Sequence, residues 1–229
     1  MAALLESSGQ YRVLRRIEPR LPLDTPPGVP TRLGLLLDLE TTGLDPLQHE
    51  IIEIAMLPFT YGLDGTVCAV GQPFSQLRQP SQPIPPAINA LTGLTDAMVA
   101  GHSIDPAEVA QSIAPAALVI AHNAGFDRRF AEACCDAFIA KPWACSLKQV
   151  DWVAKGFESS KVGYLAMKHG LFFDDHRAVH DCQATLEILA RPLFRSGVTG
   201  FARLLETARP RCCWFPAACH PPAAPRGFG

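Results

Sequence analysis

The chain contains 229 residues, of which 48% are hydrophobic and 18% charged, and its 20 basic and 22 acidic side chains give a formal net charge of -2. This composition excludes a disordered tail protein and a strongly basic nucleic-acid coat protein, and the length allows one domain of roughly 150 to 200 residues with extensions. Residues 31–208 carry 13 basic and 19 acidic side chains, a net charge of -6, so this segment repels a polyanion unless another source supplies positive charge.

Membrane and secretion signals are missing from the sequence. No apolar run approaches the ~20 residues that span a bilayer. The N-terminal segment has neither the basic start nor the hydrophobic stretch of a signal peptide. The eight cysteines show no C-x-x-C spacing, which favours small buried side chains in a reducing compartment. We therefore expect a cytoplasmic protein without a membrane partner.

Prolines separate the N-terminus from the rest of the chain. Five of them fall within twelve residues: Pro19, Pro22, Pro26, Pro27 and Pro30. Because they fix φ and remove backbone donors, they predict an extended linker. We expect an N-terminal extension and linker over 1–30, a folded domain over 31–208 and a Pro- and Cys-rich, poorly ordered tail over 209–229. The less favoured alternative for this tail is a metal site built from Cys212, Cys213, Cys219 and His220.

The first half of the expected domain contains three predicted strands. Residues 33–40 form a short apolar run typical of a buried strand, and Thr41-Thr42-Gly43 ends it. Residues 50–59 predict a second strand. The loop at 62–65 contains Gly and Asp and predicts a hairpin, with a third, antiparallel strand over 66–74.

Helices dominate the second half. Asp105-Pro106 predicts a helix start, because proline is favoured at the first helical position. Residues 116–122 predict another buried strand, and Asn123 is a plausible N-cap for a helix reaching about Phe138. Apolar faces over 162–169 and 179–190 predict further helices. The order of elements predicts an α/β domain in which helices pack on a mixed sheet.

Two carboxylates interrupt the leucine-rich run of the first strand. Asp38 and Glu40 are two residues apart, so their side chains point to the same face of the strand. Two like charges ~4 Å apart repel by about 4 kcal/mol at an effective dielectric near 20. Such a pair therefore indicates either a solvated strand end or a site for a compensating cation.

Two further acidic segments follow strand-to-helix or loop-to-helix junctions. Asp127 is predicted in the first turn of the helix after Asn123, where the helix dipole favours an acid. Asp181 lies about one turn into the last predicted helix. His176 precedes that helix and can accept a proton at neutral pH. His180 is the competing candidate, but it projects about 100° away from Asp181 on a helix.

Taken in order, these segments resemble the motifs of one family. LDLETTGL (37–44), HNAGFD (122–127) and HRAVHD (176–181) are similar to the three motifs of the DEDDh exonucleases. This family of the RNase H-like superfamily includes the proofreading epsilon subunit of bacterial DNA polymerase III, ribonuclease T and oligoribonuclease. The resemblance covers residues 33–195 and fills all five signature positions. It implies an RNase H-like mixed β-sheet flanked by helices.

The resemblance also implies roles for individual residues. His176 would be the general base, and two Mg2+ or Mn2+ ions would be held by four carboxylates: Asp38, Glu40, Asp127 and Asp181. Oxygen ligands suit these hard cations, and two ions can stabilise both oxygens of a phosphoryl displacement. The residues implied or considered as contacts of the terminal nucleotide are Thr41, Thr42, Gly43, Thr92, Asn123 and Phe126. Thr92 stands where relatives often have a histidine.

We therefore predict a metal-dependent 3'–5' exonuclease that releases nucleoside 5'-monophosphates from single-stranded DNA ends, in proofreading or repair. A DNA polymerase subunit is a further partner that the resemblance implies. The alternative is an RNA-directed exoribonuclease of the same fold, because sugar discrimination depends on contacts to the 2'-OH that these motifs do not specify. An inactive polymerase-associated module is disfavoured, because it is expected to lack one of the five signature residues.

Overall fold

A computed structural model describes residues 1–19, 28, 30–194 and 196–207. The predicted tail over 209–229, with its alternative cysteine and histidine metal site, lies outside the described residues, as does most of the proline-rich linker. No helix within the described ranges is long and apolar enough to cross a membrane.

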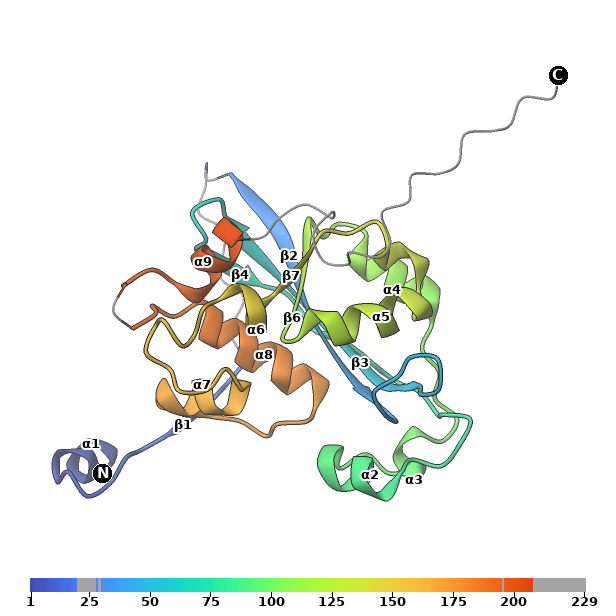
Figure 1. The fold of residues 1–229 in the computed structure, drawn as a ribbon, viewed down its shortest axis with the longest axis horizontal. Coiled ribbons are helices and arrows are strands. Elements are labelled where there is room, and N and C mark those ends of the chain that lie inside the picture. Colours follow the sequence, from blue (N-terminus) through green and yellow to red (C-terminus); the bar gives the residue numbers. More distant parts are fainter. Residues whose placement is uncertain (20–27, 29, 195, 208–229) are drawn as a thin grey trace.

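A central mixed sheet runs through the body of the molecule, with helices on both of its faces (Figure 1). Its strands are β2 (Thr31–Thr41), β3 (Ile51–Gly62), β4 (Val67–Val70), β5 (Phe74–Leu77), β6 (Leu118–Ala121) and β7 (Trp143–Cys145). The strand order is β4-β3-β2-β6-β7, and β5 also pairs with β3. Strand β2 is antiparallel to β3 and parallel to β6, and β6 is parallel to β7. The predicted α/β fold class is confirmed.

The helices precede, connect and follow these strands. They are α1 (Ala2–Ser7), α2 (Pro86–Thr92), α3 (Asp96–Val99), α4 (Pro106–Ile113), α5 (Ala124–Cys134), α6 (Ser146–Gln149), α7 (Val162–Lys168), α8 (Ala178–Leu189) and α9 (Gly200–Thr207), with a 3-10 turn at Asp136–Phe138. Helix α4 begins as predicted, because Asp105 accepts a hydrogen bond from the Ala107 amide at its start. Two short strands, β1 (Arg15–Arg16) and β8 (Leu171–Phe172), form a separate parallel pair.

The alternation of side chains along β2 divides the core into two layers. Leu36 packs in a cluster that contains Leu186 of α8. Leu35 and Leu37 pack in the other cluster, with Phe130 of α5. Because strand side chains alternate between faces, the even-numbered positions of β2 face α8, and this face is the one on which Asp38 and Glu40 follow Leu36.

One predicted strand is two strands in the structure. The segment predicted as a single strand over 66–74 forms β4 and β5, which pair with different parts of β3. Between them lies Pro73, and opposite this gap lies Pro58 of β3, so neither residue can donate a ladder hydrogen bond. The Gly71 amide instead donates to the Pro58 carbonyl at 2.8 Å.

The segment after β6 differs from the sequence analysis at one helix end and in one additional strand. The helix predicted to reach Phe138 ends at Cys134, and Cys135 is extended with φ -151° before the 3-10 turn. The apolar pattern continues past this break because Phe138 is also buried, and its ring packs on Trp143 with ring centroids 5.9 Å apart. Periodicity alone therefore did not reveal the end of the helix. Strand β7, which contains Trp143, was not predicted, because three residues are too few to display an alternating pattern.

Candidate metal centre and active site

Three carboxylates from two elements converge at the end of β2. Asp38, Glu40 and Asp181 each place one oxygen within 4.8 Å of the others. The two strand residues share the face that packs on α8, and Asp181 lies in the first turns of that helix. The structure therefore brings together acidic residues that are more than 140 positions apart in the sequence.

Asp127 approaches the same cluster from α5. Its side chain is only 3% exposed, and it lies outside the set of three oxygens that are within 4.8 Å of one another. Its charge nevertheless raises the pKa of Asp38 and of Glu40. Burial raises the pKa of Asp127 itself, whereas a hydrogen bond with the backbone of Leu39 in β2 lowers it. The four predicted ligands thus form one electrostatic group.

Burial and mutual repulsion shift the titration of this group. Burial raises the pKa of Glu40 and of Asp127 to about 8, and that of Asp181 to about 6. Burial and the neighbouring carboxylates also raise the pKa of Asp38 well above its ordinary value. Such a cluster is stable in its ionised form only beside a compensating cation. Clustered carboxylate oxygens are the donor set that Mg2+ and Mn2+ prefer, so these residues fit divalent ions.

An ion pair that the sequence analysis missed lies beside the cluster. Glu53 of β3 is opposite Glu40 in the β2–β3 register and is 2% exposed. The Arg177 Nη2 and Nε atoms donate to its two oxygens at 3.1 and 3.3 Å, and the Ala178 amide donates at 3.3 Å. Arg177 also lowers the pKa of Glu40. This pair ties the start of α8 to β3 and therefore fixes where Asp181 meets the strand.

His176 lies in the loop that enters α8. Its backbone φ of 61° is left-handed, a conformation that costs a residue other than glycine roughly 1–3 kcal/mol and is kept where the surroundings impose it. The imidazole is 44% exposed, and its charge lowers the pKa of Asp181. His180 Nδ1 instead lies 3.1 Å from the Asp174 carbonyl oxygen. The His176 Nε2 atom lies 3.8 Å from Asp175 Oδ2, and the choice of His176 over His180 as the base stays a prediction.

The turn after β2 is held by its own polar groups. The Thr41 hydroxyl donates to the Gly43 carbonyl at 2.6 Å. The Thr42 amide donates to the Glu50 carbonyl, and the Glu50 amide donates to the Thr42 hydroxyl, each at 2.9 Å. A Cβ at Gly43 would overlap the His49 ring. These contacts rigidify the turn beside the carboxylates, and its contact with a nucleotide stays a prediction.

The other three predicted contact residues occupy different environments. Thr92 is buried, and its hydroxyl donates to the Ile88 carbonyl and accepts from the Leu94 amide. Asn123 is exposed at the first position before α5, with φ 88° and no capping hydrogen bond from its side chain. It therefore starts the helix by adopting the left-handed conformation that Asn tolerates, and the predicted side-chain cap is absent. Phe126 packs on Phe130, with ring centroids 5.0 Å apart.

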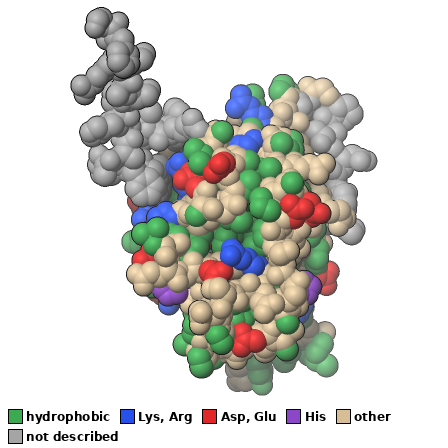
Figure 2. All heavy atoms as spheres, turned by 90° about the vertical axis from the view of Figure 1, so that its right-hand side faces the viewer, with side chains coloured by type: hydrophobic (Ala, Val, Ile, Leu, Met, Phe, Trp, Pro, Cys, Tyr) green, Lys and Arg blue, Asp and Glu red, His purple; other side chains and the backbone are tan. Residues whose placement is uncertain are grey.

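Charged side chains of both signs are dispersed over the described surface that carries α4 and α5. On the face in Figure 2, lysine and arginine appear as separate spots between acidic and apolar groups and form no continuous basic stripe. An extended polyanion would gain little attraction on such a face.

Known proteins match most of this chain. The family model RNase_T, described as an exonuclease family, matches residues 35–189. The chain is 30% identical over 180 residues to exodeoxyribonuclease 10 of Escherichia coli strain K12, covering 76% of this chain and 75% of the relative. It is 28% identical over 192 residues to a PolC-type DNA polymerase III of Thermotoga petrophila, covering 75% of this chain but 13% of the polymerase.

Solved structures of two exonucleases align with the fold of this chain. A structure of exonuclease X in complex with 5' overhanging duplex DNA aligns with a TM-score of 0.55 and 27% identity, over 77% of this chain and 99% of the other. A structure of exonuclease I aligns with a TM-score of 0.57 over 69% of this chain and 40% of the other, and at 17% identity it supports the fold alone.

Proposed function

We propose that this chain, which belongs to the RNase_T exonuclease family, removes nucleotides one at a time from the 3' end of single-stranded DNA by two-metal hydrolysis. Family membership makes the chain a 3'–5' exonuclease of a divalent-metal-dependent family. The observation that carries the proposal is the convergence of Asp38, Glu40 and Asp181 beside His176.

The proposed metal ligands are the four acidic residues of the cluster. Asp38, Glu40 and Asp181 would hold Mg2+ or Mn2+ through their clustered oxygens, and Asp127 would add its charge from α5. When bound, the ions would neutralise the phosphate and lower the pKa of the attacking water. The burial of Glu40 and Asp127 keeps these ligands in a low-dielectric setting, where opposite charges attract more strongly.

The remaining steps belong to the side chains around the cluster. His176 would accept the proton from the attacking water, because the imidazole is accessible to solvent and close enough to Asp181 to lower its pKa. The Thr41–Gly43 turn would hold the terminal nucleotide, with Asn123 and Phe126 shaping the opposite wall. Cleavage of the bond to the 3' oxygen then releases a nucleoside 5'-monophosphate.

DNA is proposed over RNA on the strength of two comparisons. The E. coli relative is named an exodeoxyribonuclease, and the aligned exonuclease X structure contains DNA. The RNA-directed alternative places the same carboxylates around a ribonucleotide. The match within a PolC-type polymerase supports a DNA polymerase subunit as a proposed partner.

Side-by-side digestion of strands of one sequence tests this proposal. Single-stranded DNA, blunt duplex DNA and short RNA, each labelled at the 5' end, are incubated with the protein and Mg2+. We expect a ladder shortening from the 3' end that appears fastest on single-stranded DNA. Faster digestion of RNA would establish the exoribonuclease alternative, and cleavage at internal positions would contradict exonuclease action.

A further inference from the structure

The N-terminal segment lies along the body beside the loop that carries His176. Strand β1 pairs in parallel with β8, and Figure 1 shows β1 next to α7. The Arg15 amide donates to the Gly170 carbonyl at 2.9 Å, and the Ile17 amide donates to the Phe172 carbonyl at 2.8 Å. This segment precedes the part of the chain that matches the exonuclease family, residues 35–189.

Two arginines, one before β1 and one within it, extend the contact through their side chains. Arg12 Nη2 donates to the Met167 and Lys168 carbonyls, at 2.8 and 3.0 Å, at the C-terminal end of α7. Arg16 Nη1 lies 2.6 Å from Asp174 Oδ2, and its guanidinium lies over the Phe172 ring at 5.0 Å. The segment is thus attached to α7, to β8 and to the start of the His176 loop.

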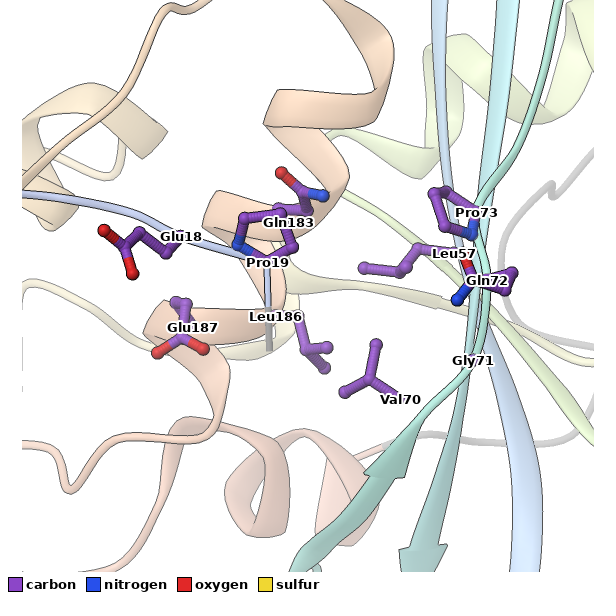
Figure 3. Close-up of a pocket in the computed structure, with 10 residues that line it drawn as sticks. All are labelled: Glu18, Pro19, Leu57, Val70, Gly71, Gln72, Pro73, Gln183, Leu186 and Glu187. Atoms are coloured by element: carbon purple, nitrogen blue, oxygen red, sulfur yellow. The ribbon is translucent and has the colours of Figure 1, made fainter. Parts of the chain in front are cut away.

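Apolar contacts continue the same segment onto α8. Ile17 packs against the hydrophobic cluster that includes α8. Figure 3 shows Glu18 and Pro19 beside Gln183 and Leu186 of α8, on one wall of a pocket of about 80 Å³. We call residues 12–19 the N-terminal strap, because they run from α7 past β8 to α8.

The strap meets the active site through Asp174. This residue is two positions before His176, and besides its ion pair with Arg16 its carbonyl oxygen lies 3.1 Å from His180 Nδ1 of α8. On the other side of His176, Arg177 is tied to Glu53. A residue held at φ 61° needs such constraints on both sides.

We infer that the N-terminal strap is a positioning element, which holds the 173–177 loop through the Arg16–Asp174 contact so that His176 faces the carboxylate cluster. The inference rests on the proposed function, because it assigns the strap a role in the work of the proposed base. Arg16 and Asp174 are positioning residues that act through His176 and touch no reacting atom.

The test combines Arg16→Ala with His176→Ala in the full-length chain and measures kcat and KM on single-stranded DNA with Mg2+. A misplaced catalytic group can cost up to about 100-fold in rate, so we expect Arg16→Ala to lower kcat roughly 10-fold with KM changed less than about twofold. In the His176→Ala background, Arg16→Ala should cause no further loss. Arg15→Ala is the matched control, because the Arg15 side chain has no hydrogen bond or ion pair with any described residue.

Amide exchange of Arg15 and Ile17 supplies a readout that is independent of activity. Both amides should be protected in the wild-type chain and exchange faster in Arg16→Ala. Equal kcat values for Arg16→Ala and Arg15→Ala, or the same loss with and without His176, would overturn the inference. An inactive wild-type chain with protected strap amides would instead count against the proposed function.

Discussion

The two histidines at the start of α8 differ in what surrounds them. His176 has a left-handed backbone and an accessible ring that lowers the pKa of Asp181, whereas His180 is engaged with the Asp174 carbonyl. Their order in the sequence does not reveal this difference. It arises because His176 lies in a loop and has a left-handed backbone, whereas a residue inside the helix follows the direction of its helical face.

Replacing each histidine separately tests this assignment. General-base catalysis contributes about 100- to 10,000-fold, so His176→Ala should lower kcat by at least about 100-fold, and His180→Ala by less than about 10-fold. The melting temperature of each variant shows whether it is folded at the assay temperature. The kcat values are then compared at equal concentrations of folded protein. A larger loss for His180→Ala would reverse the assignment of the base.

Glu53 illustrates what residue patterns could and could not predict. The same signal that singled out Asp38 and Glu40, an acid within an apolar strand, is present at Glu53. What no pattern specifies is its partner, because Arg177 is 124 positions away and meets Glu53 only after α8 packs on the sheet. The cluster's members were predictable from local motifs, while the contacts that orient them depend on tertiary packing.

At the scale of elements, the site is the junction of β2, α5 and α8. Each element contributes at least one buried or half-buried acid to one small volume. Burial raises the pKa of Glu40 and of Asp127 to about 8 in each case, and the neighbouring carboxylates add to the rise at Glu40. An acid whose pKa is higher in the folded state than its ordinary value near 4 binds more protons when folded. Its contribution to the free energy of unfolding therefore falls as pH rises toward the folded pKa.

We expect the free energy of unfolding of the metal-free protein to fall as pH rises from about 6.5 to about 8, where Glu40 and Asp127 are ionised in the unfolded chain but still protonated in the folded one, and to level off above about pH 8. His122, whose pKa burial lowers to about 4, acts in the opposite direction, but only below its ordinary value near 6.5. Ions that bind the ionised cluster offset the repulsion, so the rise in melting temperature on adding Mg2+ should be larger at about pH 8.5 than at about pH 6.5.

The measurement is a thermal melt at each pH, with and without a fixed concentration of Mg2+. The variant Asp127→Asn serves as the matched control, because it removes one buried charge from α5 and should flatten the pH dependence. A Mg2+ effect that does not change with pH, or that also persists fully in Asp127→Asn, would contradict a metal site built on this group.

Strong periodic patterns predicted most elements at their observed places. Strands β2, β3 and β6 and helices α7 and α8 lie where apolar runs and helical faces indicated. The inaccurate expectations concern β4 and β5, divided at Pro73, and β7, which has three residues. Their presence depends on pairing partners elsewhere in the sheet, which local periodicity does not encode.

At the scale of the whole molecule, charge explains where a substrate can be held. Residues 31–208 have a net charge of -6, and the four proposed ligands account for much of it. Two bound divalent ions would bring this segment near -2. On the face in Figure 2 the charges are dispersed and form no broad basic surface, and bound divalent ions would concentrate positive charge at the carboxylate cluster.

The central claim is that the cluster at the end of β2 hydrolyses a 3' terminus with the help of divalent ions. The most direct measurement follows a 5'-labelled single-stranded DNA incubated with the full chain in Mg2+, in excess chelator, and after Mg2+ is restored. We predict stepwise shortening with release of nucleoside 5'-monophosphates, loss of activity in chelator and recovery on restoration. Asp38→Asn should be inactive under all three conditions, and undiminished degradation in excess chelator would contradict the account.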